Sequence, residues 1–381
     1  GQSWAGFKGD KFPAVAVRDL AIQPRDNDLV IATHGRGIWI IDDITPLRAL
    51  STDLMSREAA FVTARPVQQR ISGPGGWANG AAVFVGENPP GGAVLTYYQR
   101  TRHLFGPLKL EILDANGRVV DELPASKRRG LNRVEWSMRE KPPHVPPAVQ
   151  LAFAGTQGPR VLPGTYTARM TKGGQVYEHK FDVGLDRRAS FTVEQRKQQY
   201  DAAMRVHQLF GEETAVLDRI QQLRAGVAAA RANTAVDAAT KTKLAAFEAK
   251  LDDVRKRIVA TKEGGAITGE ERLREHTDLL YGAIMGYEGA PGAYQVERIS
   301  VLQAELVDIE QQFERLVAAD LPAVNQALQD AGQPPITAPA KVPAMANAGI
   351  SSANAHWLST RKRKDRKSMF HGLPQDAVRL R

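Results

Sequence analysis

Three short apolar runs near the start of the chain are separated by polar turn residues. They cover residues 15–22, 29–33 and 37–42, with PRDND and HGRG between them. Gly35 and Gly37 allow the positive φ angles that a tight turn needs. The pattern predicts a three-stranded β-meander over residues 1–50. Because its runs are apolar on both faces, we expect this sheet to lie between neighbouring layers on each side.

Alternation of apolar and polar residues marks the next part of the chain. Seven stretches between residues 81 and 183 have strand character: AAVFV, AVLTYY, LKLEIL, RVVDEL, NRVEWS, TYTARM and QVYEHKFDV. Seven strands in about 100 residues is the size of an immunoglobulin-like β-sandwich, which we place at residues 71–188 after a connecting segment at 51–70. The alternating positions of Trp136 and Tyr166 predict core side chains. Residues 141–160 are too proline-rich for a central strand and predict a long exposed loop.

Between residues 189 and 330 the apolar residues recur with helical spacing. Steps of three and four residues separate the members of two stripes: Leu244, Phe247, Leu251, Val254 and Ile258, then Ile299, Leu302, Leu306, Ile309, Phe313 and Leu316. Two further helices are expected at 193–226 and 270–286, with breaks at Gly264-Gly265, at residues 286–292 and at Leu321-Pro322. This predicts an antiparallel bundle of about four helices. The same stripes could instead join two copies of the chain.

The end of the chain has the composition of a linker followed by a basic tail. We predict disorder for residues 331–381, which include a proline-rich stretch and RKRKDRK at 361–367. The formal net charge is +9, and residues 350–381 alone hold eight Lys/Arg against two Asp/Glu. Nucleic-acid binding by this tail would weaken steeply with added salt. The aromatic interleaving of single-strand binding platforms is missing, so we do not expect a specific nucleic-acid function.

Overall composition indicates a multidomain α+β protein. The chain has 381 residues, of which 43% are hydrophobic and 24% charged, and it contains no cysteine. The lack of cysteine excludes disulfides, thiolate metal sites and cysteine nucleophiles. No apolar run reaches the roughly 18–20 residues of a membrane-spanning helix. The first residues do not have the pattern of a signal peptide.

One segment resembles a known family. Residues 19–47, DLAIQPRDNDLVIATHGRGIWIIDDITPL, resemble the closing blade of bacterial β-propellers related to sortilin and to BNR (Asp-box) proteins, often described as glycosyl hydrolase or sialidase-like. The phrases NPPGGAVLTYY, GLNRVEW and LPGTYTARM resemble the immunoglobulin-like module that follows the propeller in that family. The Asp-box turns of preceding blades are missing. The resemblance therefore implies a partial propeller blade, the C-terminal part of a periplasmic or secreted protein.

Candidate catalytic residues gather around the third apolar run. His34, Arg36, Asp42 and Asp43 are of the types that a sialidase-like site uses, because a guanidinium binds a substrate carboxylate bidentately and a protonated carboxyl acts as general acid. The alternative is structural: His34 and Arg36 would hydrogen-bond between blades, and Asp42 and Asp43 would cap a strand end. A propeller site takes residues from several blades, so one blade holds at most a share of it.

The remaining motifs offer few candidate binding or catalytic residues. Trp77, in a glycine-rich loop, is a candidate for stacking on a sugar ring, whereas the remaining aromatic residues have core positions. No metal-binding or nucleophile-elbow motif is present, and GPGGWA lacks the strand, helix and lysine of a phosphate-binding loop, so we expect neither metal nor cofactor. We expect a non-catalytic part of a protein that binds protein or glycan ligands and acts as a scaffold. The alternative is a fragment of a glycoside hydrolase whose catalytic residues lie mostly in other blades.

Overall fold

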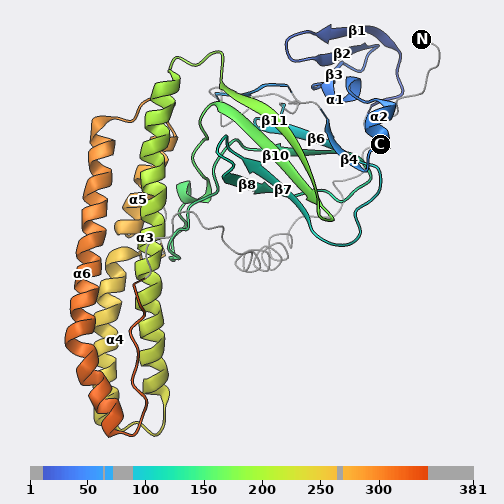
Figure 1. Cartoon of the computed structure of the whole chain (residues 1–381). Helices are drawn as coiled ribbons and strands as arrows, with labels where there is room; N and C mark the ends of the chain where they lie inside the picture. The colour runs from blue at the N-terminus through green and yellow to red at the C-terminus, as the bar shows by residue number, and fades with distance from the viewer. Residues whose placement is uncertain (1–11, 63–64, 72–88, 264–268, 342–381) are drawn as a thin grey trace, which may run out of the picture. The chain divides into compact units, whose positions relative to one another are not determined.

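The computed structural model describes residues 12–62, 65–71, 89–263 and 269–341 of the chain. These residues form three β-sheets and a group of long helices, a mixed α and β content that is compatible with the predicted multidomain α+β class (Figure 1). The residues up to Pro339 belong to one compact unit. The basic stretch 361–367 and the rest of the predicted disordered tail after residue 341 lie outside the described residues.

The first sheet is the predicted meander. Its antiparallel strands, in the order β1-β2-β3, are β1 (Val17–Gln23), β2 (Asp28–Thr33) and β3 (Ile38–Ile41). Gly35 and Gly37 both have positive φ angles in the turn between β2 and β3, as the sequence predicts. Two short helices follow, α1 (Thr45–Arg48) and α2 (Thr52–Ser56).

Two further sheets enclose a hydrophobic core of their own. The five-stranded sheet has the order β5-β11-β10-β7-β8, and the three-stranded sheet has the order β4-β6-β9. Their strands are β4 (Ala59–Val62), β5 (Val67–Gln69), β6 (Ala93–Gln99), β7 (Leu108–Leu113), β8 (Val119–Leu123), β9 (Gly130–Trp136), β10 (Gly164–Lys172) and β11 (Gln175–Leu185). Trp136 packs against Tyr166, with ring centroids 5.2 Å apart, and against Phe181. The core positions predicted for Trp136 and Tyr166 are confirmed.

The boundary of this two-sheet region differs from the prediction. Residues 51–70, predicted to be a connection, contribute β4 to one sheet and β5 to the other. Strand β4 reads AAFV and β5 has only three residues, so neither has enough length to show alternation. They are strands because they pair with β6 and β11. The predicted strand AAVFV, residues 81–85, lies outside the described residues.

Residues 141–160 join the sheets to the helices. Within them the only regular element is a single turn of 3₁₀ helix at Ala154–Thr156, in keeping with the predicted loop. Their backbone forms hydrogen bonds to helix side chains: Thr214 donates to the carbonyl of His144 at 2.7 Å, and the Gly155 N–H donates to Asp278 at 2.8 Å. The loop is thus fixed against two helices and is only partly exposed.

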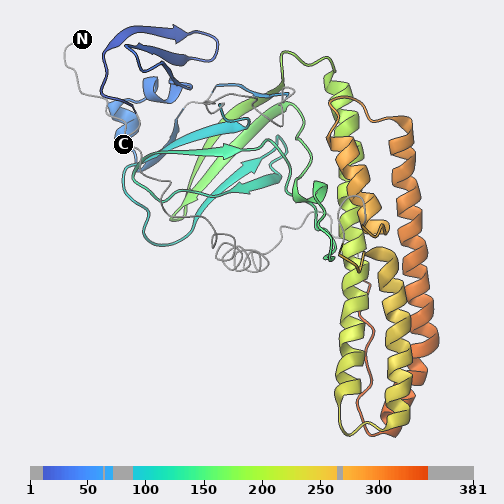
Figure 2. The same ribbon diagram turned by 180° about the vertical axis from the view of Figure 1, so that it is seen from behind.

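Four long helices share one hydrophobic core. They are α3 (Val193–Ala232), α4 (Ala238–Ile258), α5 (Leu273–Met285) and α6 (Ala293–Asp330). Both views show α4 and α5 following one another along the length that α3 and α6 span (Figures 1 and 2). The stripe from Leu244 to Ile258 is buried in this core, as is the stripe from Ile299 to Phe313, while Leu316 is partly buried against it. The stripes therefore serve the internal core of the chain rather than a contact between copies.

The predicted helix break at Leu321-Pro322 is wrong. Helix α6 continues through Pro322 to Asp330. An interior proline removes one hydrogen bond and disfavours the helix by about 3 kcal/mol. Leu321, Val324 and Leu328 are buried on the same face of α6, and their burial offsets that loss.

The predicted disorder from residue 331 is also wrong for the residues that the structure describes. The chain turns back along the helices, where Ile336 exchanges two hydrogen bonds with the Asn325 side chain, at 2.7 and 3.0 Å. Arg219 donates to the carbonyl of Pro339, and Ile336 and Ala338 pack against the helical core. A proline-rich composition predicts an extended backbone correctly, but it does not show whether that backbone is packed.

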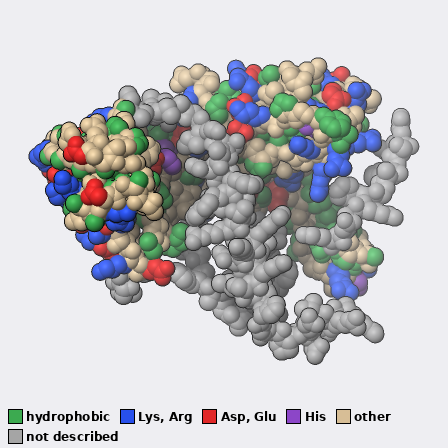
Figure 3. All heavy atoms as spheres, turned by 90° about the horizontal axis from the view of Figure 1, so that it is seen from below, with side chains coloured by type: hydrophobic (Ala, Val, Ile, Leu, Met, Phe, Trp, Pro, Cys, Tyr) green, Lys and Arg blue, Asp and Glu red, His purple; other side chains and the backbone are tan. Residues whose placement is uncertain are grey.

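Charge and hydropathy add two observations. On the face shown in Figure 3, Lys and Arg side chains stand among acidic and apolar ones. Among the described residues no helix combines the length and apolarity needed to cross a bilayer.

Candidate functional site

The four candidate residues of the meander lie at opposite ends of the β2–β3 hairpin. His34 and Arg36 belong to the exposed turn that follows β2, whereas Asp42 and Asp43 follow β3 at the other end. With a rise of about 3.3 Å per strand residue, the two pairs are separated by on the order of 15 Å. The structure therefore does not bring His34 and Arg36 together with the aspartates. Trp77 lies outside the described residues.

Asp42 and Asp43 line a cavity of about 210 Å³ between the meander and the two-sheet region. The cavity walls are rich in both charges. The carboxylates come from the meander: Asp26, Asp28, Asp42 and Asp43. The guanidiniums come mostly from the other side: Arg25, Arg65, Arg70, Arg133 and Arg187. We treat this cavity as the candidate site.

Part of this charge is used to hold the cavity wall together. The Asp43 N–H donates to Asp28 Oδ1 at 2.9 Å, and Asp43 Oδ1 accepts from the Thr45 N–H at 3.1 Å. Asp43 has a φ of 46°, which such side-chain bonds help to maintain. Arg25 and Arg65 both pair with Asp26, at 2.7 and 3.4 Å. For Asp43 the contacts support the structural alternative, a residue that shapes the end of β3.

Asp42 has a different environment. Burial raises the pKa of its carboxyl, and the neighbouring Asp28 raises it further, while Arg133 and Arg70 act in the opposite direction. No hydrogen bond joins the Asp42 side chain to any other described residue. A carboxyl with a raised pKa can donate a proton or a hydrogen bond nearer to neutral pH than an ordinary aspartate.

Three arginines complete the cavity from the two-sheet region. Arg70 follows β5, Arg133 lies on β9 and Arg187 follows β11. Within the described part of the chain none of the three guanidiniums has a carboxylate partner. Sequence reasoning missed them because they come from three separate segments without a shared motif. They reach one wall because β5 pairs with β11 in one sheet and that sheet packs against the sheet that contains β9.

The arrangement is suited to an anionic ligand that also carries hydroxyl groups. Unpaired guanidiniums bind carboxylate, sulfate or phosphate with two parallel hydrogen bonds, and Asp42 is available to a hydroxyl. In the described ranges no group of three or more His, Asp or Glu is placed to hold a metal ion. These contacts describe a site that can bind an anionic ligand and that contains one proton donor, Asp42.

Comparison with known proteins adds no relative. No protein-family model, curated protein or solved structure matches the chain.

Proposed function

We propose that the chain is the non-catalytic, C-terminal part of an exported sortilin-like β-propeller protein that binds an acidic protein or glycan and acts as a scaffold. In this proposal the meander is the closing blade of the propeller. The two-sheet region is its immunoglobulin-like module, and the helices are an antiparallel bundle that supports it. Periplasmic or secreted localisation is part of the same proposal, and the resemblance of residues 19–47 supports it.

The observation that carries the proposal is the exposure of large apolar side chains on both faces of the meander. On one face Leu20 and Ile22 are 59% and 48% exposed, and on the other Ile38 and Ile40 are 72% and 59% exposed. The strand register places each pair on its own face, since Leu20 opposes Ile31 and Ile40 opposes Val30. An isolated three-stranded sheet with two such faces is marginal in water, and burial would stabilise each large apolar side chain by about 1.5–3 kcal/mol.

Neighbouring blades are the occupants that fit these faces. A propeller blade buries each of its faces against the sheet of an adjacent blade, which is the covering that a short meander with apolar side chains on both faces requires. The candidate cavity adds the binding role, because its unpaired guanidiniums lie beside the meander and face an open volume.

A spin label at position 40 tests the assembly. The chain has no cysteine, so Ile40→Cys gives a single attachment point. We expect a mobile label in the present chain and an immobilised one when the chain is extended by the residues encoded before Gly1. A label at Lys243→Cys, an exposed position of α4 away from the meander, is the control and should stay mobile in both. A reading frame without further β-meanders before Gly1, or a label at position 40 that remains mobile in the extended protein, contradicts the proposal.

Asp42 favours one alternative, a glycoside hydrolase whose other catalytic groups lie elsewhere. A general acid needs a raised pKa, and Asp42 has one beside a second carboxylate, Asp28. We nevertheless expect no turnover of aryl glycosides or sialosides by the chain, because the other carboxylates of the cavity are already engaged. Asp28 and Asp43 accept hydrogen bonds from the backbone, and Asp26 pairs with Arg25 and Arg65. The measurement is release of the aryl group over several hours. Hydrolysis that disappears in Asp42→Asn and persists in Arg36→Ala would establish the hydrolase instead.

A further inference from the structure

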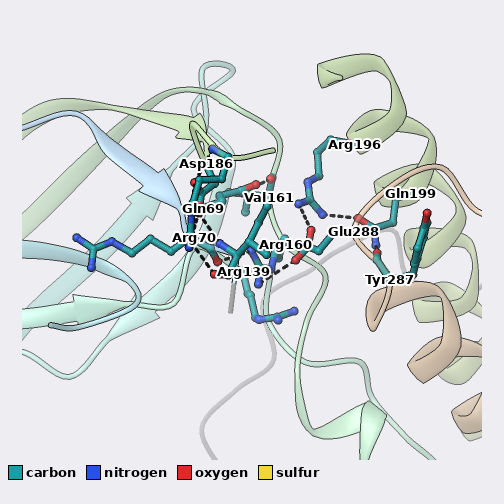
Figure 4. A network of polar contacts seen from close by, with 12 residues as sticks. Gln69, Arg70, Arg139, Arg160, Val161, Asp186, Arg196, Gln199, Tyr287 and Glu288 are labelled. Atoms are coloured by element: carbon teal, nitrogen blue, oxygen red, sulfur yellow. Dashed lines mark hydrogen bonds and ion pairs between the residues drawn. The ribbon is translucent and has the colours of Figure 1, made fainter. Parts of the chain in front are cut away.

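A second cluster of arginines lies where the two-sheet region meets the helices (Figure 4). Arg139 and Arg160 form an isolated bridge between the ends of the loop that carries the helix contacts. Arg196 comes from the first turns of α3, and Glu288 from the connection between α5 and α6. Four segments that are distant in sequence thus place three guanidiniums and one carboxylate at one joint.

The charges of this joint do not balance. Glu288 pairs with Arg160 at 3.1 Å through Oε1 and with Arg196 through Oε2. The Arg139 guanidinium donates to the carbonyl of Gly158 at 3.0 Å, and no carboxylate within the described residues pairs with it. Among the groups that line the joint, one carboxylate therefore faces three guanidiniums, and the nearby Asp186, which also acts on Arg160, is already paired with Arg188. Burial, and after it the neighbouring Arg160, lower the pKa of Arg139, while Tyr281 and Glu288 act in the opposite direction.

A small cavity lies among these guanidiniums. Arg139, Arg160 and Arg196 line it together with Gln199 and Tyr200, and its volume is about 10 Å³. That volume is of the order that holds one water molecule or one monatomic ion. It excludes a carboxylate-bearing ligand, a phosphate or a sugar from this position.

Arg196 supplies an independent observation, a buried donor without an acceptor, on a guanidinium that also stacks over the Phe191 ring. Its side chain is 2% exposed. Two of its nitrogens bind Gln199 and Glu288, but Nε is buried without a hydrogen-bond partner. A buried N–H of a charged group without an acceptor is costly, so such groups are nearly always satisfied by protein, water or ion.

We propose that the joint binds one chloride-sized anion among Arg139, Arg160 and Arg196. The anion accepts hydrogen bonds from guanidinium N–H groups and supplies part of the missing negative charge. Because the binding residues come from both the sheets and α3, binding occurs only when the two parts are docked, and it stabilises the folded chain. This proposal is independent of the cavity at the meander and of any propeller assembly.

The first experiment compares melting temperatures of the full chain in sodium chloride and in sodium gluconate at one ionic strength. Raising chloride from 10 to 150 mM at the expense of gluconate should raise the melting temperature by a few degrees. Arg139→Gln should lose this dependence. Arg169→Gln, which breaks an exposed ion pair between Arg169 of β10 and Glu178 of β11, should keep it. Equal melting in both salts, or a chloride dependence that survives in Arg139→Gln, overturns the proposal.

A second variant keeps the proposal testable if Arg139→Gln fails to fold. Glu288→Gln removes the carboxylate that competes with the anion, so chloride should bind several-fold more tightly. The readout is broadening of the ³⁵Cl NMR line on adding protein, and its reversal by bromide. Broadening in the wild-type chain that increases in Glu288→Gln supports the site. The absence of broadening in both proteins, or weaker broadening in Glu288→Gln, contradicts it.

Discussion

Glu213→Gln is expected to remove the loss of stability between pH 5 and 9 that ionisation of this one carboxyl causes in the wild-type chain. Glu213 lies on α3 and is fully buried in the helical core. Its Oε1 accepts a hydrogen bond from Thr277 at 2.6 Å, and its Oε2 has no partner in the described part of the chain. Burial raises the pKa of this carboxyl to about 8.

The sign of the effect follows from the two protonation states. The charged groups that face Glu213 are Glu275 and Arg274 on α5 and Glu305 on α6, and Arg274 already pairs with Glu275 at 2.8 Å. The folded chain therefore holds Glu213 protonated, whereas the unfolded chain releases the proton near the ordinary value of 4.5. The stability that the protonated Glu213 side chain contributes is fully present below about pH 4.5 and is lost as the pH rises through about 8. At about 1.4 kcal/mol per unit, the loss is on the order of 4 kcal/mol.

Urea denaturation at pH 5, 7 and 9 measures this effect. Glutamine keeps the size of the side chain and cannot ionise, so the free energy of unfolding of Glu213→Gln should exceed that of the wild type by an amount that grows with pH. Glu194→Gln, an exposed position in the first turn of the same helix, is the matched control and should follow the wild-type profile. Parallel profiles for wild type and Glu213→Gln would show that position 213 does not titrate in this range.

The sequence was most informative where a local period reports burial. The stripe from Leu244 to Ile258 predicted α4, and alternation around Trp136 predicted β9. Prediction from the sequence failed where contacts with residues distant in sequence decide which element forms. Strand β5 exists through parallel pairing with β11, and α6 passes through Pro322 because its apolar face is buried. Periodicity contains no information about such partners.

The candidate site shows the same division. The sequence drew attention to Asp42 and Asp43, which line the candidate cavity, but it grouped them with His34 and Arg36, because neighbours in sequence are taken as neighbours in space. A strand between two turns places its ends far apart. Arg70, Arg133 and Arg187 could not be predicted at all, since each is an ordinary surface residue until the sheets place them on one cavity wall.

Gly158→Ala is expected to destabilise the protein by about 3 kcal/mol or more, because it disrupts the joint between the sheets and the helices. A Cβ on Gly158 would lie 1.9 Å from the carbonyl oxygen of Glu140 and 2.6 Å from that of Lys141. Both are backbone atoms, so no side chain can move aside. The Glu140 N–H also donates to Pro159 at 2.9 Å, which holds the two segments at this distance.

Displacing Glu140 affects both parts of the protein. Its carboxylate accepts two hydrogen bonds from Arg118, at 2.8 and 3.0 Å, and one from the Tyr200 hydroxyl of α3 at 2.7 Å. The Gly158 carbonyl is the acceptor for Arg139, so the same substitution should also abolish the chloride dependence of melting. Gly91→Ala, where an added Cβ meets nothing within 4 Å, is the control and should stay within about 0.5 kcal/mol of the wild type. Guanidinium chloride is unsuitable here because it supplies chloride, so urea unfolding is the measurement. A Gly158→Ala chain as stable as Gly91→Ala would mean that the loop does not approach Glu140 this closely.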